Sequence, residues 1–199
     1  MKKMMCVGVL VTSAAAGMAQ ESRQDASISA TGNFTPFVNG TGGNKQSSTS
    51  SLGFLGSYRY MLTPRSALEA NYSFTQYSTT FTTNFLPNVQ VRTRQQEVSV
   101  AYVYSFNFRN FNPFVEVGPA ALLFSPIHDY STTTQDTKRT TGIGALFGAG
   151  VAYELSPSFD IRAQYRGFSV KAPDFGNTQF NTNRYEVISM PTIGVAYHF

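Results

Sequence analysis

The sequence predicts an all-β protein, an eight-stranded antiparallel up-and-down transmembrane β-barrel whose outer face contacts lipid. Eight segments alternate apolar and polar residues with a period of two, as strands do when their two faces meet different surroundings. The connections between these segments are alternately long and short, which is typical of barrels that cross a membrane. The closing segment, Arg184–Phe199, alternates in the same way and ends on an aromatic residue. Its apolar residues on one face are Val187, Ile193, Val195, Tyr197 and Phe199, opposite Thr192, Gly194, Ala196 and His198.

The N-terminus predicts export. Lys2 and Lys3 precede a short apolar run and the small-residue pattern Gly17-Met18-Ala19, which together indicate a signal peptide over residues 1–19. We expect a barrel domain over residues 20–199. The single cysteine, Cys6, lies in the signal peptide, so the exported chain has no disulfide and no cysteine metal site. Charged residues make up only 13% of the chain and form no basic cluster, which argues against a nucleic-acid partner.

The eight predicted strands can be placed by their alternation. In each, the apolar face is expected outside and the face with polar, charged or small residues inside. The strands are expected at Ser27–Phe34, Leu52–Met61, Leu68–Thr75, Glu97–Phe106, Phe114–Phe124, Gly144–Tyr153, Phe159–Gly167 and Arg184–Phe199.

The connections predict which end of the barrel faces which compartment. Long polar loops are expected at about 38–50, 78–93, 125–138 and 172–183, and tight turns at 62–65, 107–112 and 155–158. Outer-membrane barrels carry their long loops outside the cell and their short turns in the periplasm. Pro119 and Pro191 fall within predicted strands, where proline removes a ladder hydrogen bond, so we expect a bulge or a shifted boundary at each.

Outward aromatic residues gather at the short-turn end, as expected for a girdle at the membrane interface. They are Tyr58, Tyr60, Tyr104, Phe106, Tyr153, Phe159, Tyr197 and Phe199. With its closing strand, strand number and loop pattern, the sequence resembles the small outer-membrane barrels of the OmpA transmembrane domain, OmpX and opacity-protein type. The resemblance implies a monomer that crosses the outer membrane repeatedly in contact with its lipid. It also implies that the assembly machinery reads the C-terminal strand, through Tyr197 and Phe199.

Six charged residues are predicted to face the lumen. Arg59, Glu69, Glu116 and Arg162 lie near the short turns, and Glu97 and Arg166 lie further along their strands. The interior of an eight-stranded barrel is just wide enough for side chains, and an unpaired charge there costs several kcal/mol. We therefore expect Arg59 and Arg162 to neutralise Glu69 and Glu116. The network could act as a gate or simply fill the lumen.

The sequence predicts no enzyme and no cofactor. His128, Asp129 and Ser131 are too close in one loop to give the geometry of a catalytic triad. The glycines from Gly142 to Gly150 lack nucleotide-loop spacing and share one strand face, and no histidines or carboxylates have metal-ligand spacing. The predicted function is a structural scaffold or an adhesin-like surface protein whose loops meet a ligand. A small porin for ions or solutes is the alternative. A soluble lipocalin-like binder is disfavoured, because such barrels place their apolar face inside.

Overall fold

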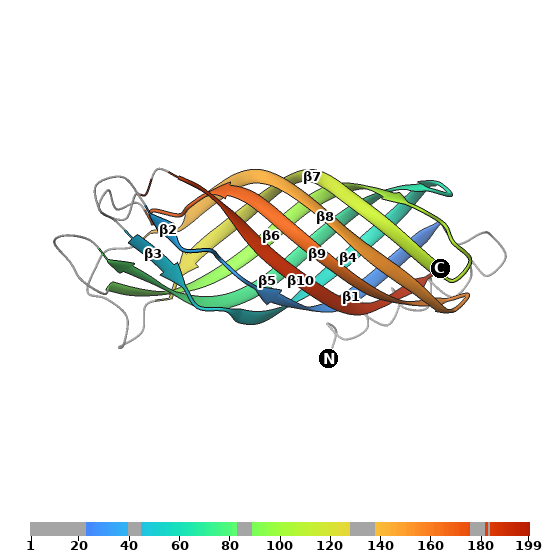
Figure 1. Ribbon diagram of the computed structural model, residues 1–199, viewed down its shortest axis with the longest axis horizontal. Helices are drawn as coiled ribbons and strands as arrows, with labels where there is room; N and C mark the ends of the chain where they lie inside the picture. Colours follow the sequence, from blue (N-terminus) through green and yellow to red (C-terminus); the bar gives the residue numbers. More distant parts are fainter. Residues whose placement is uncertain (1–22, 40–44, 83–88, 128–137, 176–181, 183) are drawn as a thin grey trace, which may run out of the picture.

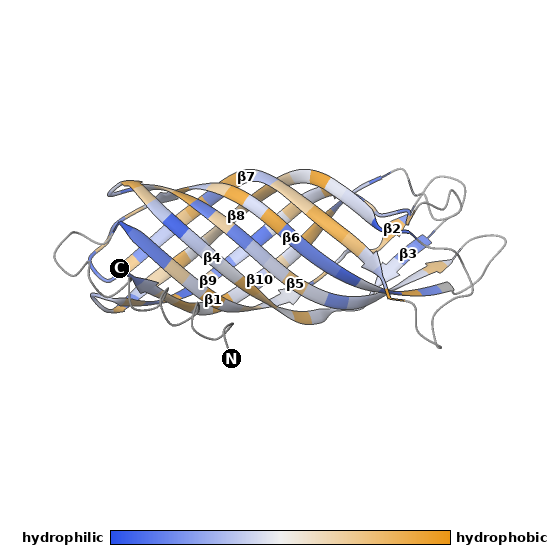
Figure 2. Ribbon diagram, turned by 180° about the vertical axis from the view of Figure 1, so that it is seen from behind, coloured by the Kyte–Doolittle hydropathy of each residue, from blue (hydrophilic) through white to orange (hydrophobic). Residues whose placement is uncertain are grey.

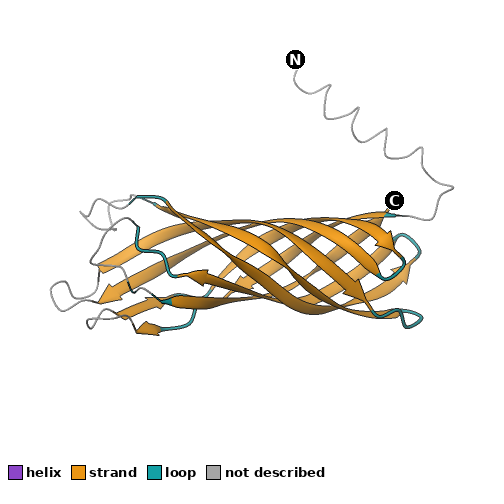
Figure 3. Ribbon diagram, turned by 90° about the horizontal axis from the view of Figure 1, so that it is seen from above, coloured by secondary structure: helices purple, strands orange, loops and turns teal. Residues whose placement is uncertain are grey.

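The computed structural model describes residues 23–39, 45–82, 89–127, 138–175, 182 and 184–199. Within them, all regular structure is strand, and the strands join in one antiparallel sheet that closes through the pairing of β5 with β6 (Figures 1 and 3). Among these residues, no helix is long and apolar enough to cross a bilayer. The strands are β1 (Gln24–Asn33), β2 (Val38–Asn39), β3 (Lys45–Ser48), β4 (Ser51–Thr63), β5 (Ser66–Thr82), β6 (Val89–Ser105), β7 (Phe111–Pro126), β8 (Thr140–Ser156), β9 (Phe159–Lys171) and β10 (Tyr185–His198).

Eight of these strands form the wall of the barrel, which confirms the predicted fold. From β4 to β10 each strand pairs with the next along the chain, and β1 lies between β4 and β10 to complete the ring. The short strands β2 and β3 form within the first expected loop. β3 pairs with the C-terminal end of β5, residues 79–82. In Figure 1 they lie at the opposite end of the barrel from the C-terminus.

The second expected loop is shorter than predicted. Residues 78–82 and 89–93 belong to β5 and β6, which remain paired up to Phe81 and Val89. The polar composition of this stretch suggested a loop, but Tyr77, Phe81 and Val91 are buried on the inner side of the ribbon. The outer face of the strands is polar here, and the buried inner face mixes these apolar residues with Thr79 and Thr93. Each is 17 residues long, more than the roughly 9–11 residues that cross a bilayer, so this ribbon extends beyond the membrane.

The predicted inner and outer faces agree with the structure. Ile28, Leu52 and Val117 are among the exposed apolar residues on the outer surface, whereas Thr31, Asn71 and Ser99 are buried inside. Figure 2 shows hydrophobic and hydrophilic residues alternating along the strands. Of the eight predicted girdle aromatics, seven are exposed and Tyr104 is partly buried.

The prolines do not produce the expected bulges. The register of β7 with β8 runs unbroken through Pro119, and that of β10 with β9 through Pro191. The ladder is interrupted instead between each proline and its second neighbouring strand, which is β6 for Pro119 and β1 for Pro191. The register before each interruption is the same as the register after it. Beside each proline two residue pairs are therefore missing from the ladder, but the strand is not shifted. Register shifts occur at two tight turns instead, between Met61 and Thr63 and between Glu154 and Ser156.

Candidate functional site

The lumen near the short turns is crossed by ion pairs. Arg162, on β9, donates two hydrogen bonds to the carboxylate of Asp25 on β1, at 2.8 and 2.7 Å. Arg59, on β4, donates from Nε to Oε2 of Glu69 on β5, at 2.6 Å. All four side chains are almost completely buried. These two pairs link four of the eight wall strands. They form the charged layer of the lumen that lies nearer to the short turns, called the inner layer below.

A histidine and a second aspartate extend this inner layer toward the turns. Nε2 of His198 lies 2.8 Å from Oδ2 of Asp160, and that oxygen lies 4.0 Å from Nη2 of Arg162. His198 comes from the closing strand and Asp160 from the strand beside it. The last inward residue of the chain is therefore tied into the same polar layer.

A second charged layer lies farther from the turns. Both terminal nitrogens of Arg166 bind the carboxylate of Glu97, each at 3.0 Å, and Nη2 also donates to Oγ of Ser99 at 3.2 Å. Nε of Arg166 lies 3.5 Å from Oε1 of Glu116. The guanidinium also stacks on the ring of Phe168, 5.1 Å from its centroid. One fully buried arginine thus balances two carboxylates from β6 and β7.

All six residues predicted for the lumen lie in it. Arg59 pairs with Glu69, one of the two carboxylates that Arg59 and Arg162 were expected to neutralise, but Arg162 and Glu116 have other partners. Arg162 pairs with Asp25 and Glu116 contacts Arg166. The strand register explains the second contact, because Gly148 is opposite both Glu116 and Arg166 and has no side chain between them. Counting residues from the turns could not reveal this, because tilted strands bring residues at unequal counts to one height. Asp25 was missed because the first strand begins earlier than predicted; its odd number places it on the inward face.

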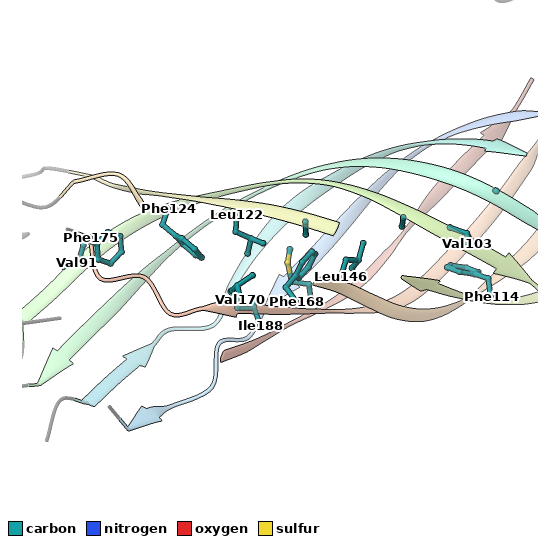
Figure 4. Close-up of a cluster of buried hydrophobic side chains, with 14 of the residues drawn as sticks. Val91, Val103, Phe114, Leu122, Phe124, Leu146, Phe168, Val170, Phe175 and Ile188 are labelled. Carbon is teal, nitrogen blue, oxygen red and sulfur yellow. The ribbon is translucent and has the colours of Figure 1, made fainter. Parts of the chain in front are cut away.

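The outer half of the lumen contains a row of apolar side chains, beside buried polar residues that include Thr93, Gln95 and Glu186. Figure 4 shows them following one another along the barrel, from Phe175 and Val91 past Phe124, Leu122, Phe168 and Ile188 to Leu146. Phe175 follows β9 and has a positive φ of 51°, and its ring packs edge-on against Phe81, 6.0 Å between centroids. Leu146 was already expected to face inward, and it is joined inside by further large apolar residues at the same strand parity. The alternation itself contained the signal, since Leu122, Phe124, Phe168 and Ile188 all have the inward parity of their strands.

A vestibule of about 270 Å³ opens at the short-turn end. Asn112, Glu154 and His198 lie along its sides, and Arg59, Arg162 and Phe114 are among the residues that line it. The guanidinium of Arg59 stacks on Phe114 at 4.8 Å, so charged and aromatic groups pack together where the vestibule meets the ion pairs.

The closing strand joins the aromatic girdle. The ring of Phe199 lies 6.1 Å from Tyr197 and 6.5 Å from Tyr58 across the β10–β1–β4 seam. Its backbone N–H donates to the carbonyl of Gln24 at 3.0 Å, so the terminal residue is itself held to β1.

Two remaining points concern the loop residues considered for catalysis and the possibility of a metal site. His128, Asp129 and Ser131 lie outside the described residues. Within the residues that are described, no group of three or more histidine, cysteine or acidic side chains is arranged to hold a metal ion.

A closed sheet of eight wall strands, apolar outside and filled inside, defines the class of small membrane β-barrels. The model of the outer membrane protein beta-barrel domain family matches residues 7–199, and the chain belongs to that family. The fold and the resemblance to small outer-membrane barrels are thereby confirmed, and the family supports a location in the outer membrane.

Solved structures of the same fold are similar over nearly the whole chain. OprG from Pseudomonas aeruginosa has a TM-score of 0.65 at 12% identity, covering 90% of this chain and 97% of its own. Neisserial surface protein A has a TM-score of 0.59 at 15% identity, with 89% and 98% covered. Ail, the attachment invasion locus protein of Yersinia pestis, has a TM-score of 0.51 at 16% identity, with 90% and 100% covered. At these identities the likeness concerns the fold alone. No curated protein matches the sequence.

Proposed function

We propose that the protein is a monomeric outer-membrane scaffold that presents its extracellular loops for surface interaction and has no catalytic activity. The observation that supports this proposal is the filled lumen. Two layers of buried ion pairs lie toward the short turns, and an apolar core lies beyond them. If the lumen neither conducts ions nor binds a substrate, the outer face and the loops are the parts of the barrel that can interact with other molecules.

A small porin is the competing proposal, and the vestibule is the observation that favours it. A solute could enter about 270 Å³ of space from the periplasmic end. To pass further it would have to separate Arg162 from Asp25 or Arg59 from Glu69, which leaves a buried charge unpaired at a cost of several kcal/mol. The scaffold therefore explains the geometry better.

Proteoliposome swelling separates the two functions. Vesicles containing the folded barrel are diluted into iso-osmotic arabinose, beside vesicles without protein and vesicles with a general-diffusion porin. A scaffold should swell no faster than the empty vesicles. Swelling that rises with the amount of barrel added would establish the porin instead.

Residues 1–19 are proposed as the export signal and Tyr197 with Phe199 as the signal for the assembly machinery. The composition of the leader and the exposed position of the two rings support these assignments. The mass of the protein isolated from outer membranes tests the first assignment. It should correspond to a chain that begins at Gln20, and the mass of the full chain would contradict it.

A further inference from the structure

A buried carboxylate in the outer half of the lumen has no partner among the described residues. Glu186, on β10, is 3% exposed, and neither of its carboxylate oxygens accepts a hydrogen bond from them. Its inward neighbours are apolar, because Val170 lies opposite it on β9 and Ile188 follows it on β10, both in the row of side chains in Figure 4. An ionised carboxylate in such surroundings is costly unless a proton or a cation neutralises it.

The chain supplies no lysine or arginine to neutralise Glu186. The residue lies near the outer end of β10, beyond the roughly 9–11 residues of a strand that cross a bilayer. Burial alone raises the pKa of its carboxyl to about 7, and no cation of the described residues opposes this effect. Neither lysine nor arginine occurs in the sequence of the segments between the described ones, which are 40–44, 83–88, 128–137, 176–181 and 183. A cation from solution is therefore free to take this place.

Uncharged polar groups face Glu186 from the other side of the barrel. Tyr77 lies in the part of β5 beyond the membrane, and burial together with the negative charge of Glu186 raises the pKa of its hydroxyl. Tyr77 is opposite Thr93 on β6, and Gln95 lies two residues further along the same inner face. Gln95 is 1% exposed, and neither atom of its amide has a hydrogen-bond partner among the described residues. The interior of eight strands is so narrow that side chains from opposite walls meet.

The donor atoms and the charge indicate which cation fits. Carboxylate and amide oxygens are hard donors, which bind metal cations that prefer oxygen. One carboxylate balances one positive charge, whereas a divalent ion beside a single acid would leave a net charge in the buried interior. The pair of Glu186 and Gln95 therefore suits an alkali-metal cation better than calcium or magnesium.

We propose that the outer lumen binds one alkali-metal cation between the carboxylate of Glu186 and the amide oxygen of Gln95. The bound ion neutralises Glu186 and joins β10 to β6 across the lumen. The barrel is therefore more stable with the ion than without it. This proposal goes beyond the scaffold function, and its test does not depend on solute swelling or on what the loops bind.

Urea unfolding at constant ionic strength tests the proposal. The folded barrel in lipid vesicles is unfolded at about pH 8.5, where the Glu186 carboxyl is mostly ionised, in choline chloride, sodium chloride or potassium chloride. An ion that binds only the folded state lowers the unfolding equilibrium constant in proportion to its occupancy. At about 100 mM, sodium or potassium should lower this constant at least roughly tenfold relative to choline, which is too large for a buried site. At about pH 5.5 the difference should disappear, because a proton then neutralises the carboxyl.

Three variants assign the effect to the site. Glu186→Gln keeps the shape of the side chain without its charge and should show no difference between the salts. Gln95→Leu keeps the charge but lacks the amide oxygen and should lose most of the difference. The matched control is Glu154→Gln, which removes a carboxyl that lines the vestibule at the other end of the barrel, and it should respond as the unmutated protein does.

Every variant is first shown to be folded by its gel mobility before and after boiling. The proposal is overturned if the unmutated barrel is equally stable in all three salts, or if the difference persists at the lower pH. It is also overturned by an undiminished response of Glu186→Gln or Gln95→Leu, by a lost response of Glu154→Gln, or by stabilisation that calcium chloride provides and the alkali-metal salts do not.

Discussion

Replacing Arg166 by methionine should destabilise the barrel more than any single change at an exposed arginine. Arg166 is fully buried and balances Glu97 and Glu116, so its removal leaves two carboxylates without a cation. Removing one partner of a buried pair costs about 3–5 kcal/mol. We expect a loss of this size in the free energy of unfolding.

A charge-neutral variant isolates the electrostatic part of this cost. In Arg166→Met/Glu97→Gln/Glu116→Gln the lumen keeps nearly the same volume but contains no charge at this level. Buried ion networks replaced as a whole are often close to neutral in stability, so this triple variant should recover most of the loss. Arg65→Met, at an exposed tight turn, serves as the control and should change stability by less than about 0.5 kcal/mol.

Urea unfolding in lipid vesicles, followed by circular dichroism and by the mobility of unboiled samples, gives these free energies. A loss below about 1 kcal/mol for Arg166→Met would show that the residue is not the buried partner of two carboxylates. So would a triple variant that is no more stable than the single one.

Three further changes test other parts of the structure. Deleting Phe199 should reduce insertion into the outer membrane far more than His198→Ala, because the exposed ring and the hydrogen bond from its backbone N–H to Gln24 join the end of the chain to β1. Insertion is measured in isolated membranes, and equal insertion of the two variants would contradict the proposed role of Phe199. Gly118→Ala should cost about 1–3 kcal/mol in urea unfolding, because a Cβ there would clash with the carbonyl oxygen of Val100. Gly56→Ala has open space and should be neutral, and similar values for both variants would contradict the close approach of β7 to β6. Arg162→Ala should remove the two hydrogen bonds to Asp25, leaving only His198 at 4.0 Å, and should either lower unfolding stability or open a small ion leak; unchanged stability together with a silent bilayer would mean that the pair does not close the lumen.

The wall of the barrel was predictable because its signal is local. Each strand alternates with a period of two, and a lipid exterior forces the apolar residues of every strand to one parity. The faces of Arg59, Glu97 and Phe199 could therefore be assigned before any contact was known. The tight turns at Pro64 and Pro157 were also readable from sequence.

The pairing inside the lumen was not predictable in the same way. Which charge meets which depends on strand tilt and register around the whole ring, as the pairing of Arg162 with Asp25 and of Glu116 with Arg166 demonstrates. The extension of β5 and β6 was missed because their outer ends are polar on the outside and mix polar with apolar residues on the inside, so the alternation of the membrane part is lost. Phe81 and Val91 lie in the segment that was predicted as a loop, and only their burial identifies them as core.

The most direct test of the filled lumen is the ion current through the unmutated protein in a planar bilayer. The buried pairs of Arg162 with Asp25 and of Arg166 with Glu97, and the apolar core beyond them, occupy the lumen at successive levels along the barrel. We therefore predict that insertion of the folded barrel, verified by its mobility before boiling, produces no steady conductance step. A large, steady single-channel current would contradict the account and assign the protein to the porins.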